Sequence, residues 1–278
     1  MMKLYNDISQ QCSKFTTETY STSFSSAIKL LQPHIQQPVF NIYGFVRLAD
    51  EIVDTFHEHD KRGLLQRFKQ ETFVSIEQKI SLNPILQSFQ RTVNEYSIPA
   101  ELIEAFFQSM EMDLHKAEYS SDEYKTYIYG SAEVVGLMCL QVFCNGNKDQ
   151  YENLKPFAQS LGAAFQKVNF LRDLKADYTQ LNRTYFPDVD FTNFSVKEKL
   201  KIEQDIELDF EHAYKGIAQL PLSARFGVYV AFKYYQQLFK KIKKTRAKNI
   251  LKQRISIPGY LKSMIVLNAG LKYKLNLI

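Results

Sequence analysis

Two short segments of this sequence each carry a pair of aspartates four residues apart. The first, RLADEIVD, contains Asp50 and Asp54, and the second, RDLKAD, contains Asp173 and Asp177. Both segments have a helical pattern, and like charges at this spacing share a helix face and repel by about 0.2–0.5 kcal/mol. A bound divalent cation would turn that repulsion into a pair of ligands. Mg²⁺ prefers oxygen donors and is usually held by one or two carboxylates together with substrate phosphates.

The first pair belongs to a polar stripe on its predicted helix. On a wheel of about 100° per residue, the stripe is about 60° wide and contains Tyr43, Arg47, Asp50 and Asp54. An apolar face of about 120° on the same wheel lies beside it, and Glu51 falls off the stripe. This helix therefore combines a buried face with a line of residues suited to a metal or a phosphate.

The second pair repeats this arrangement. Within about 80° of the wheel lie Gly162, Gln166, Asn169, Asp173 and Asp177. A single aspartate pair is most simply explained as a solvated helix face, because charged residues are mostly exposed. The duplication, with an arginine next to each pair, instead favours a divided site that holds a diphosphate through bridging Mg²⁺ ions.

Four blocks of the sequence carry a resemblance to a known family. They are, in chain order, SKFTTETYSTSFSSAIKLL, YGFVRLADEIVD, YIYGSAEVVGLM and QKVNFLRDLKADYTQLNRTYFP. Together they resemble the squalene and phytoene synthase family of head-to-head prenyl transferases, over residues 5–260. The resemblance implies an all-α isoprenoid-synthase fold around a central apolar cavity, with the two aspartate pairs on opposing helices at its mouth.

The resemblance also implies roles for individual residues. The metal ligands would be Asp50, Asp54, Asn169, Asp173 and Asp177. Catalytic roles would fall to the four aspartates together with Arg47 and Tyr129. The residues that would contact substrate diphosphate are Ser21, Ser23, Tyr43, Arg47, Gln166, Asn169, Arg172, Arg183, Tyr185 and Arg254.

The reaction implied is the joining of two identical allylic diphosphates. It passes through a cyclopropylcarbinyl diphosphate (prephytoene diphosphate), releases diphosphate and depends on Mg²⁺, with Mn²⁺ as an alternative. The segment RISIPGYLK resembles the phytoene type, which condenses two geranylgeranyl diphosphates and for which NADPH is not expected. Squalene or dehydrosqualene synthase, acting on two farnesyl diphosphates, is the alternative. A non-catalytic relative acting as an assembly or scaffold protein is a second alternative, but it predicts eroded aspartate pairs.

Aromatic and small residues fit such a reaction. Carbocations need a dry pocket, and aromatic rings can stabilise them by about 0.5–2 kcal/mol each. The candidate rings are Phe24, Tyr43, Phe45, Tyr127, Tyr129 and Phe165, for each of which core packing is the alternative. Gly130, Ser131, Ala132 and Gly136 are small enough either to leave room for an isoprenoid chain or to allow close helix packing.

Composition limits the other functions. The chain has 278 residues, an apolar content of 45% and a net charge of +5, which is too weak a basic excess to indicate nucleic acid by itself. Its three cysteines form no CxxC pair, and no signal peptide or membrane span is recognisable, so we expect a soluble protein of the cytoplasm. The basic segment 240–254 has three explanations: a solvated helix face, peripheral attraction to anionic lipid at the inner face of the membrane, or a diphosphate contact from Arg254.

The pattern of prolines, few glycines and 3.6-residue periodicity predicts about ten helices in one domain, residues 1–278. The predicted helices are 3–19, 21–32, 38–58, 61–80, 84–96, 100–117, 122–144, 149–180, 195–219, 222–252 and 256–275.

Overall fold

The structure, a computed structural model, describes residues 2–115, 118–180, 185–187, 189, 194–251 and 254–275, without the side chains of 176–180 and 248. These residues form helices and no β-strand, which confirms the all-α prediction. The helices are α1 (Met2–Tyr20), α2 (Thr22–Ile28), α3 (Pro33–Asp54), α4 (Lys61–Gln78), α5 (Pro84–Tyr96), α6 (Ala100–Asp113), α7 (Ser121–Ile128), η1 (Tyr129–Glu133), α8 (Val134–Cys144), α9 (Lys148–Gln180), α10 (Val196–Ile217), α11 (Leu222–Lys244), α12 (Ala247–Ile250) and α13 (Gly259–Lys274).

Two predicted helix boundaries are wrong for identifiable reasons. Helix α3 begins at Pro33, a first-turn position where the missing N–H has no cost, and it continues through Pro38, which is buried within the helix. The predicted helix 222–252 is broken at Thr245, whose extended backbone ends α11 before the short α12 begins. Pro38 therefore did not mark the start of α3. The basic segment 240–254 kept a helical pattern across Thr245, so the break between α11 and α12 was not predicted.

The predicted helix 122–144 contains a π-helical turn. Residues Tyr129–Glu133 form η1 between α7 and α8, and such single π-turns inside α-helices are frequent at functional sites. By length and composition the run Ser121–Cys144 could cross a membrane, and 56% of its most apolar window is buried inside the fold. Its hydrophobicity is accounted for by its central place in the fold.

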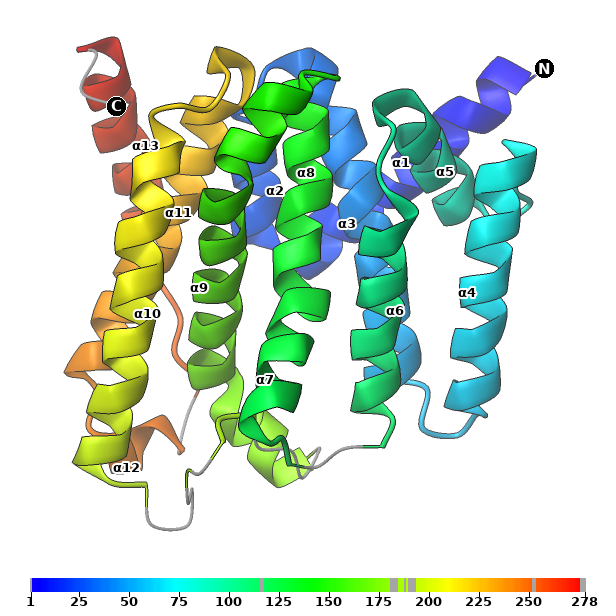
Figure 1. The fold of residues 1–278 in the computed structure, drawn as a ribbon. Helices are drawn as coiled ribbons and strands as arrows, with labels where there is room; N and C mark the ends of the chain where they lie inside the picture. The colour runs from blue at the N-terminus through cyan, green and yellow to red at the C-terminus, as the bar shows by residue number, and fades with distance from the viewer. Residues whose placement is uncertain are drawn as a thin grey trace.

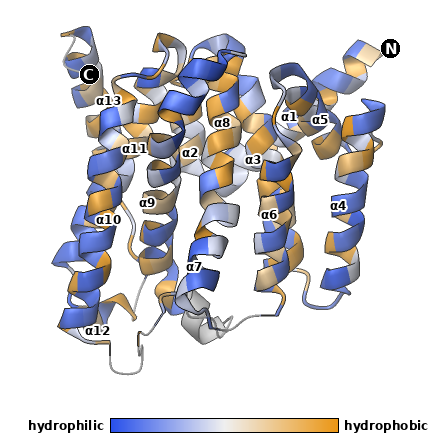
Figure 2. Ribbon diagram, in the orientation of Figure 1, coloured by the Kyte–Doolittle hydropathy of each residue, from blue (hydrophilic) through white to orange (hydrophobic). Residues whose placement is uncertain are grey.

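The long helices run side by side, as Figure 1 shows for α4, α6, α9 and α10. The outer helices α4 and α10 are mostly hydrophilic in Figure 2, whereas α8, in the middle, carries more hydrophobic residues. Two apolar clusters hold the array together: one joins α3, α5, α6 and α8, and the other joins α9, α10 and α11. Helix α9 packs against α8, η1, α10 and α11, so its residues reach both clusters.

Candidate active site

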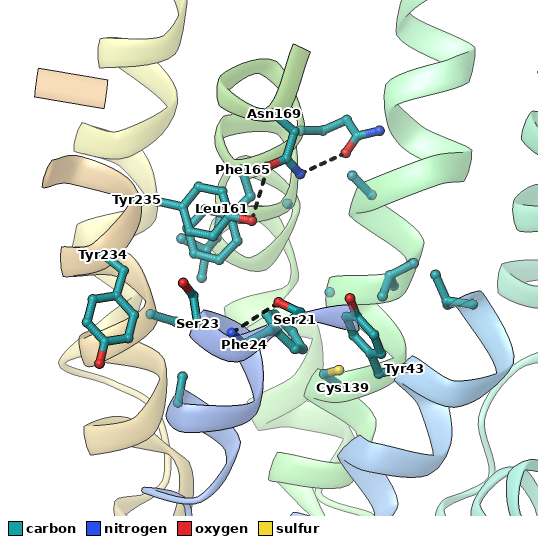
Figure 3. Close-up of a pocket in the computed structure, with 18 of the residues that line it drawn as sticks. Ser21, Ser23, Phe24, Tyr43, Cys139, Leu161, Phe165, Asn169, Tyr234 and Tyr235 are labelled. Atoms are coloured by element: carbon teal, nitrogen blue, oxygen red, sulfur yellow. Dashed lines mark hydrogen bonds between the residues drawn. The ribbon is translucent and has the colours of Figure 1, made fainter. Parts of the chain in front are cut away.

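A cavity of about 750 Å³ lies between α2, α3, α8, α9 and α11. Along α9 its wall extends from Leu154 to Asp173, which corresponds to about 28 Å at 1.5 Å per residue. The lining is polar near Asp173 and apolar toward Leu154. Figure 3 shows part of the cavity lining, including Ser21, Tyr43 and Asn169. The confirmed fold thus contains the apolar cavity that the sequence predicted, with charged groups at one end.

The predicted first aspartate pair lies at that end, on the last turns of α3. Asp50 and Asp54 both line the cavity. Burial and, to a smaller extent, the neighbouring Asp54 raise the pKa of the Asp50 carboxyl to about 8, although Arg47 offsets part of this effect. The Asp50 side chain remains 31% exposed and Arg47 is its ion-pair partner at 3.8 Å. Without a cation this carboxyl therefore keeps its proton near neutral pH, and a bound cation would favour its ionised form.

Arg47 is held in place by a tyrosine ring and by a carboxylate of its own helix. Its guanidinium lies 4.2 Å above the ring of Tyr20 and forms an ion pair with Glu51, one turn further along α3. Its Nε atom is buried and has no hydrogen-bond partner. Glu51, predicted to lie off the polar stripe, is thus the partner of Arg47, which keeps a free donor for an incoming anion.

In the second half of the site, on α9, two arginines contact one carboxylate. Arg172 donates from Nε to Asp173 Oδ2 at 2.9 Å, and Arg254 donates from Nε to Asp173 Oδ1 at 2.7 Å. The predicted contact partner Arg254 is therefore next to the second aspartate motif, although 81 residues separate it from Asp173. The side chain of Asp177 and the whole of Arg183 lie outside the described residues.

Polar side chains extend the α9 stripe into the cavity. Asn169 donates to Gln166 Oε1 at 3.4 Å and accepts from the Tyr235 hydroxyl at 3.2 Å, as Figure 3 shows. Gln166 in turn lies 3.4 Å from the Ser131 hydroxyl on η1. The predicted order Gln166, Asn169, Asp173 therefore forms one continuous line, and Tyr235 of α11 joins it as a residue that the sequence did not indicate.

The two predicted serines near the N-terminus line the same cavity. Ser21 caps α2 by accepting from the Phe24 amide at 3.2 Å, and Ser21 and Ser23 both line the cavity. Burial raises the pKa of Tyr43 to about 12, and the negative charge of Asp50 adds to this effect. The Tyr43 hydroxyl therefore keeps its proton and can act as a hydrogen-bond donor.

Tyr127 lies where it was expected, but Tyr129 does not. Tyr127 lines the cavity, but Tyr129 is not among the lining residues and packs against the apolar cluster of α3, α5, α6 and α8. Two residues along a helix turn the side chain by about 200°, so only one of the pair can face the cavity. Tyr185, by contrast, lines the cavity and stacks on Phe170 at a ring distance of 4.0 Å.

Asp113 is a cavity residue that the sequence analysis missed. It is buried, accepts hydrogen bonds from the hydroxyls of Tyr127 at 2.8 Å and Tyr119 at 3.2 Å, and its charge contributes to the raised pKa of Asp50. The sequence could have indicated this residue, because Asp113 follows Met110 by three positions and so lies on the apolar face of α6. A carboxylate on a buried helix face is rare unless it is paired or functional.

The candidate aromatic rings divide into two groups. Phe24, Tyr43, Tyr127 and Phe165 line the cavity, and Phe165 stacks on Tyr235 at 3.8 Å. Phe45 is fully buried and stacks on Phe89, also at 3.8 Å, so it serves core packing.

The small residues divide in the same way. A Cβ atom on Gly130 would lie 2.4 Å from the Ala105 carbonyl oxygen, so this glycine allows α6 to approach. Ser131, Ala132 and Gly136 line the cavity and leave space in it. A Cβ atom on Gly136 would also lie 3.2 Å from the Ala158 carbonyl oxygen, so both explanations hold for this segment, and for Gly136 they hold together.

The donor set at the polar end consists of carboxylate, amide and hydroxyl oxygens. Among the described residues, no three His, Cys, Asp or Glu side chains are close enough to hold one ion by themselves. Asp50 and Asp54 provide the carboxylate oxygens that a hard divalent cation prefers, while further ligands would come from water and phosphate. The residues present therefore fit Mg²⁺ bound together with an anionic substrate.

The helical fold, the apolar cavity and its charged end define a protein suited to a long apolar molecule with an anionic head group. Residues 17–260 match the model of the squalene/phytoene synthase family. The chain belongs to this family.

Curated relatives are similar over most of the chain. The phytoene synthase of an Oncidium hybrid cultivar is 27% identical over 272 residues, covering 90% of this chain and 65% of that protein. This chain therefore spans about 65% of the length of that relative. The 4,4'-diapophytoene synthase of Staphylococcus haemolyticus is 26% identical over 192 residues, covering 67% of this chain and 65% of that protein.

Solved structures support the fold. A dehydrosqualene synthase crystal structure matches with a TM-score of 0.82 at 19% identity, covering 97% of this chain and 98% of the other. Squalene synthase HpnC from Alicyclobacillus acidocaldarius matches with a TM-score of 0.74 at 17% identity, covering 87% and 95% of the two chains. These similarities confirm the isoprenoid-synthase fold.

Proposed function

We propose that this protein is a Mg²⁺-dependent head-to-head prenyl transferase that condenses two geranylgeranyl diphosphates to phytoene. The observation that carries the proposal is the division of one cavity into a charged end, with carboxylates on α3 and arginines from three segments, and a long apolar part. A diphosphate fits the first part and an isoprenoid chain the second. The named relatives include both phytoene and diapophytoene synthases, which supports this reaction class.

The charged residues have complementary tasks. Asp50, Asp54 and Asp173 would hold Mg²⁺, which when bound supplies electrostatic stabilisation of the departing diphosphate. Arg47 offers its unpaired Nε to phosphate oxygens, while Arg254, whose side chain is 70% exposed, can move from Asp173 to the substrate. The protein thus contributes preorganised charge and needs no nucleophile of its own.

The remaining residues protect the reacting chains. When diphosphate leaves, the double bond of the second substrate attacks the allylic cation, and loss of a proton from the coupled cation closes the ring of the cyclopropylcarbinyl intermediate. Phe24, Tyr43 and Phe165 present rings to the cavity in which this happens. The apolar lining excludes water that would otherwise capture the cation. The second ionisation releases diphosphate at the same charged end, and the rearranged cation loses a proton to yield the linear product.

Squalene or dehydrosqualene synthesis from two farnesyl diphosphates is the second candidate function. The overall match to a dehydrosqualene synthase structure, at a TM-score of 0.82, favours keeping it. The two reactions share the site and differ in the length of chain that the cavity accepts. A phytoene reaction does not require a reductant, so NADPH is not part of the proposal.

The test is a product assay with the purified chain. With Mg²⁺ and geranylgeranyl diphosphate we expect release of inorganic diphosphate and formation of phytoene, both abolished by EDTA and restored by excess Mg²⁺. The variants Asp50→Asn and Asp173→Asn should each lose at least about 100-fold in rate, since each removes charge that acts at the leaving group. Asp122→Asn is the control, because this aspartate side chain is 96% exposed and lies on α7, and it should keep the wild-type rate.

The outcomes separate the candidates. Release of diphosphate with farnesyl diphosphate alone, with a thirty-carbon product, would replace the phytoene assignment with the second candidate. Absence of release with both substrates would refute the enzymatic proposal and favour the scaffold role.

A further inference from the structure

The C-terminal helix α13 is apolar but almost unburied. Of its residues Gly259–Lys274, only Ala269 is buried. A helix that is hydrophobic on all sides is normally found inside a core or in contact with lipid. Helix α13 instead lies at the edge of the array, beside α11, where its contacts include the Phe226–Tyr273 ring pair at 5.2 Å (Figure 1). Ile265 and Val266 pack against the cluster of α9, α10 and α11, so one apolar face of α13 is covered and the opposite face is not.

The exposed apolar residues form one stripe. Five large side chains between 59% and 70% exposed follow each other at helical spacing of three or four residues: Tyr260, Met264, Leu267, Leu271 and Leu275. Residues at this spacing share a face, so the stripe runs along the whole of α13. A contiguous apolar surface of this kind marks an interaction site more often than isolated exposed hydrophobics do.

The charge around the stripe indicates what it contacts. Residues 212–278 contain 14 of the 35 lysines and arginines and none of the 30 acidic residues. On α13 itself, Lys262, Lys272 and Lys274 are the only charged side chains. An apolar stripe flanked only by positive charge is complementary to an anionic lipid surface, where apolar side chains enter the acyl boundary and lysines contact head groups.

The first turn of α13 also reaches the cavity. Lys262, in the first turn of α13, lines the cavity together with Ile257 and bonds to the Thr22 hydroxyl at 3.1 Å. A surface that faced lipid here would lie next to the site where a long apolar molecule binds. We propose that the exposed face of α13, with its lysines, docks this protein on an anionic phospholipid membrane.

The test is co-sedimentation of the full chain with vesicles. Wild type should bind vesicles of phosphatidylglycerol and phosphatidylcholine, bind pure phosphatidylcholine at least tenfold less, and lose binding as salt rises. The double variant Leu267→Glu/Leu271→Glu should bind anionic vesicles at least about tenfold more weakly, because burial of each leucine contributes strongly to insertion. Both residues are exposed, so the fold and melting temperature should stay unchanged.

The matched control is Leu208→Glu on α10. Leu208 is 65% exposed, as Leu271 is, but it stands between Glu207 and Asp209 and should play no part in lipid contact. Its variant should bind vesicles as wild type does. Equal losses in the control and in the double variant would refute the proposal, as would absence of wild-type binding to anionic vesicles.

A second copy of this chain is the competing occupant of the stripe. Analytical ultracentrifugation of wild type and of the double variant distinguishes it. A wild-type dimer that becomes a monomer in the variant, with vesicle binding unchanged, would overturn the membrane assignment. Because vesicle binding needs no substrate, its result is independent of the proposed prenyl transfer.

Discussion

At the scale of single residues, the two halves of the charged end are prepared for different ligands. On α3, Asp50 is buried beside Asp54, and Arg47 only partly offsets the resulting rise in the pKa of Asp50. Asp173 on α9, in contrast, accepts from two arginines. The α3 half therefore suits a cation, while the α9 half supplies positive groups that a diphosphate can draw away from their carboxylate. A metal–diphosphate complex needs both.

The raised pKa of Asp50 predicts a pH dependence of stability. Its pKa is about 8 in the fold, against 3.8 ordinarily, so between these values the folded protein holds a proton that the unfolded chain has released. Stability therefore falls as pH rises through this window, because the native state binds more protons. Asp50→Asn removes the titrating group, and in EDTA the variant should gain stability relative to wild type between pH 5 and pH 8.

Urea unfolding of both proteins at several pH values measures this difference. The exposed Asp122→Asn variant should follow the wild-type pH profile over the same range. Parallel stability curves for wild type and Asp50→Asn would contradict the assigned environment of Asp50.

Some residues of the site could be predicted from the sequence, and others could not. Asp50, Arg47 and Tyr43 could be grouped from the sequence because one helix fixes their relative directions. Asp113 and Tyr235 could not, because they reach the cavity only through the packing of α6 and α11 against other helices. No single-helix pattern reports such packing.

At the scale of elements, the wall of the cavity depends on close contact between α9 and α10. Gly216 of α10 lies against Phe157 of α9, and both residues line the cavity. Further along, Lys167 of α9 is buried and pairs with Asp209 of α10 at 2.7 Å. Glycine at one end and a buried ion pair at the other therefore fix the position of α9, which carries half of the polar stripe.

Gly216→Ala should loosen this contact. A Cβ atom at Gly216 would lie 2.3 Å from the Phe157 Cβ atom, so the helices or the phenyl ring must shift. We expect a loss of about 1–3 kcal/mol in the free energy of unfolding, as for other overpacked sites. Gly259→Ala is the control, because no atom lies within 4 Å of the added Cβ and alanine favours the first turn of α13. Chemical denaturation checks both, and equal stabilities of the two variants would contradict the close-packing role.

The segmentation into helices could largely be predicted from periodicity, but its interruptions could not. The π-turn at Tyr129–Glu133 and the break at Thr245 leave the hydrophobic pattern intact. Both depend on how neighbouring helices pack, and the first of them lies at the point where Tyr127 rather than Tyr129 faces the cavity.

At the scale of the whole molecule, the helix array sets the length of the chain that the cavity can accept. The lined part of α9 extends from Asp173 at the charged end to Leu154 at the apolar end. Ala158 lies in this deep part, about 22 Å from Asp173 along the helix axis. A geranylgeranyl chain is one isoprene unit longer than a farnesyl chain and reaches further toward Ala158. The deep wall, and not the charged end, should therefore distinguish the two substrates.

Ala158→Phe places a ring in this deep part and should select against the longer substrate. Because the charged end is unchanged, activity with farnesyl diphosphate should be kept or raised relative to wild type. The kcat/KM with geranylgeranyl diphosphate should fall by about tenfold or more, because a steric block of a few carbon atoms costs about 1–3 kcal/mol. The ratio of the two kcat/KM values is the measurement, since any general loss of folded protein cancels in it. An unchanged ratio would show that chain length is not read at this depth. It would then place the selection nearer to the diphosphate, where the aromatic rings of α2, α3 and α9 line the cavity.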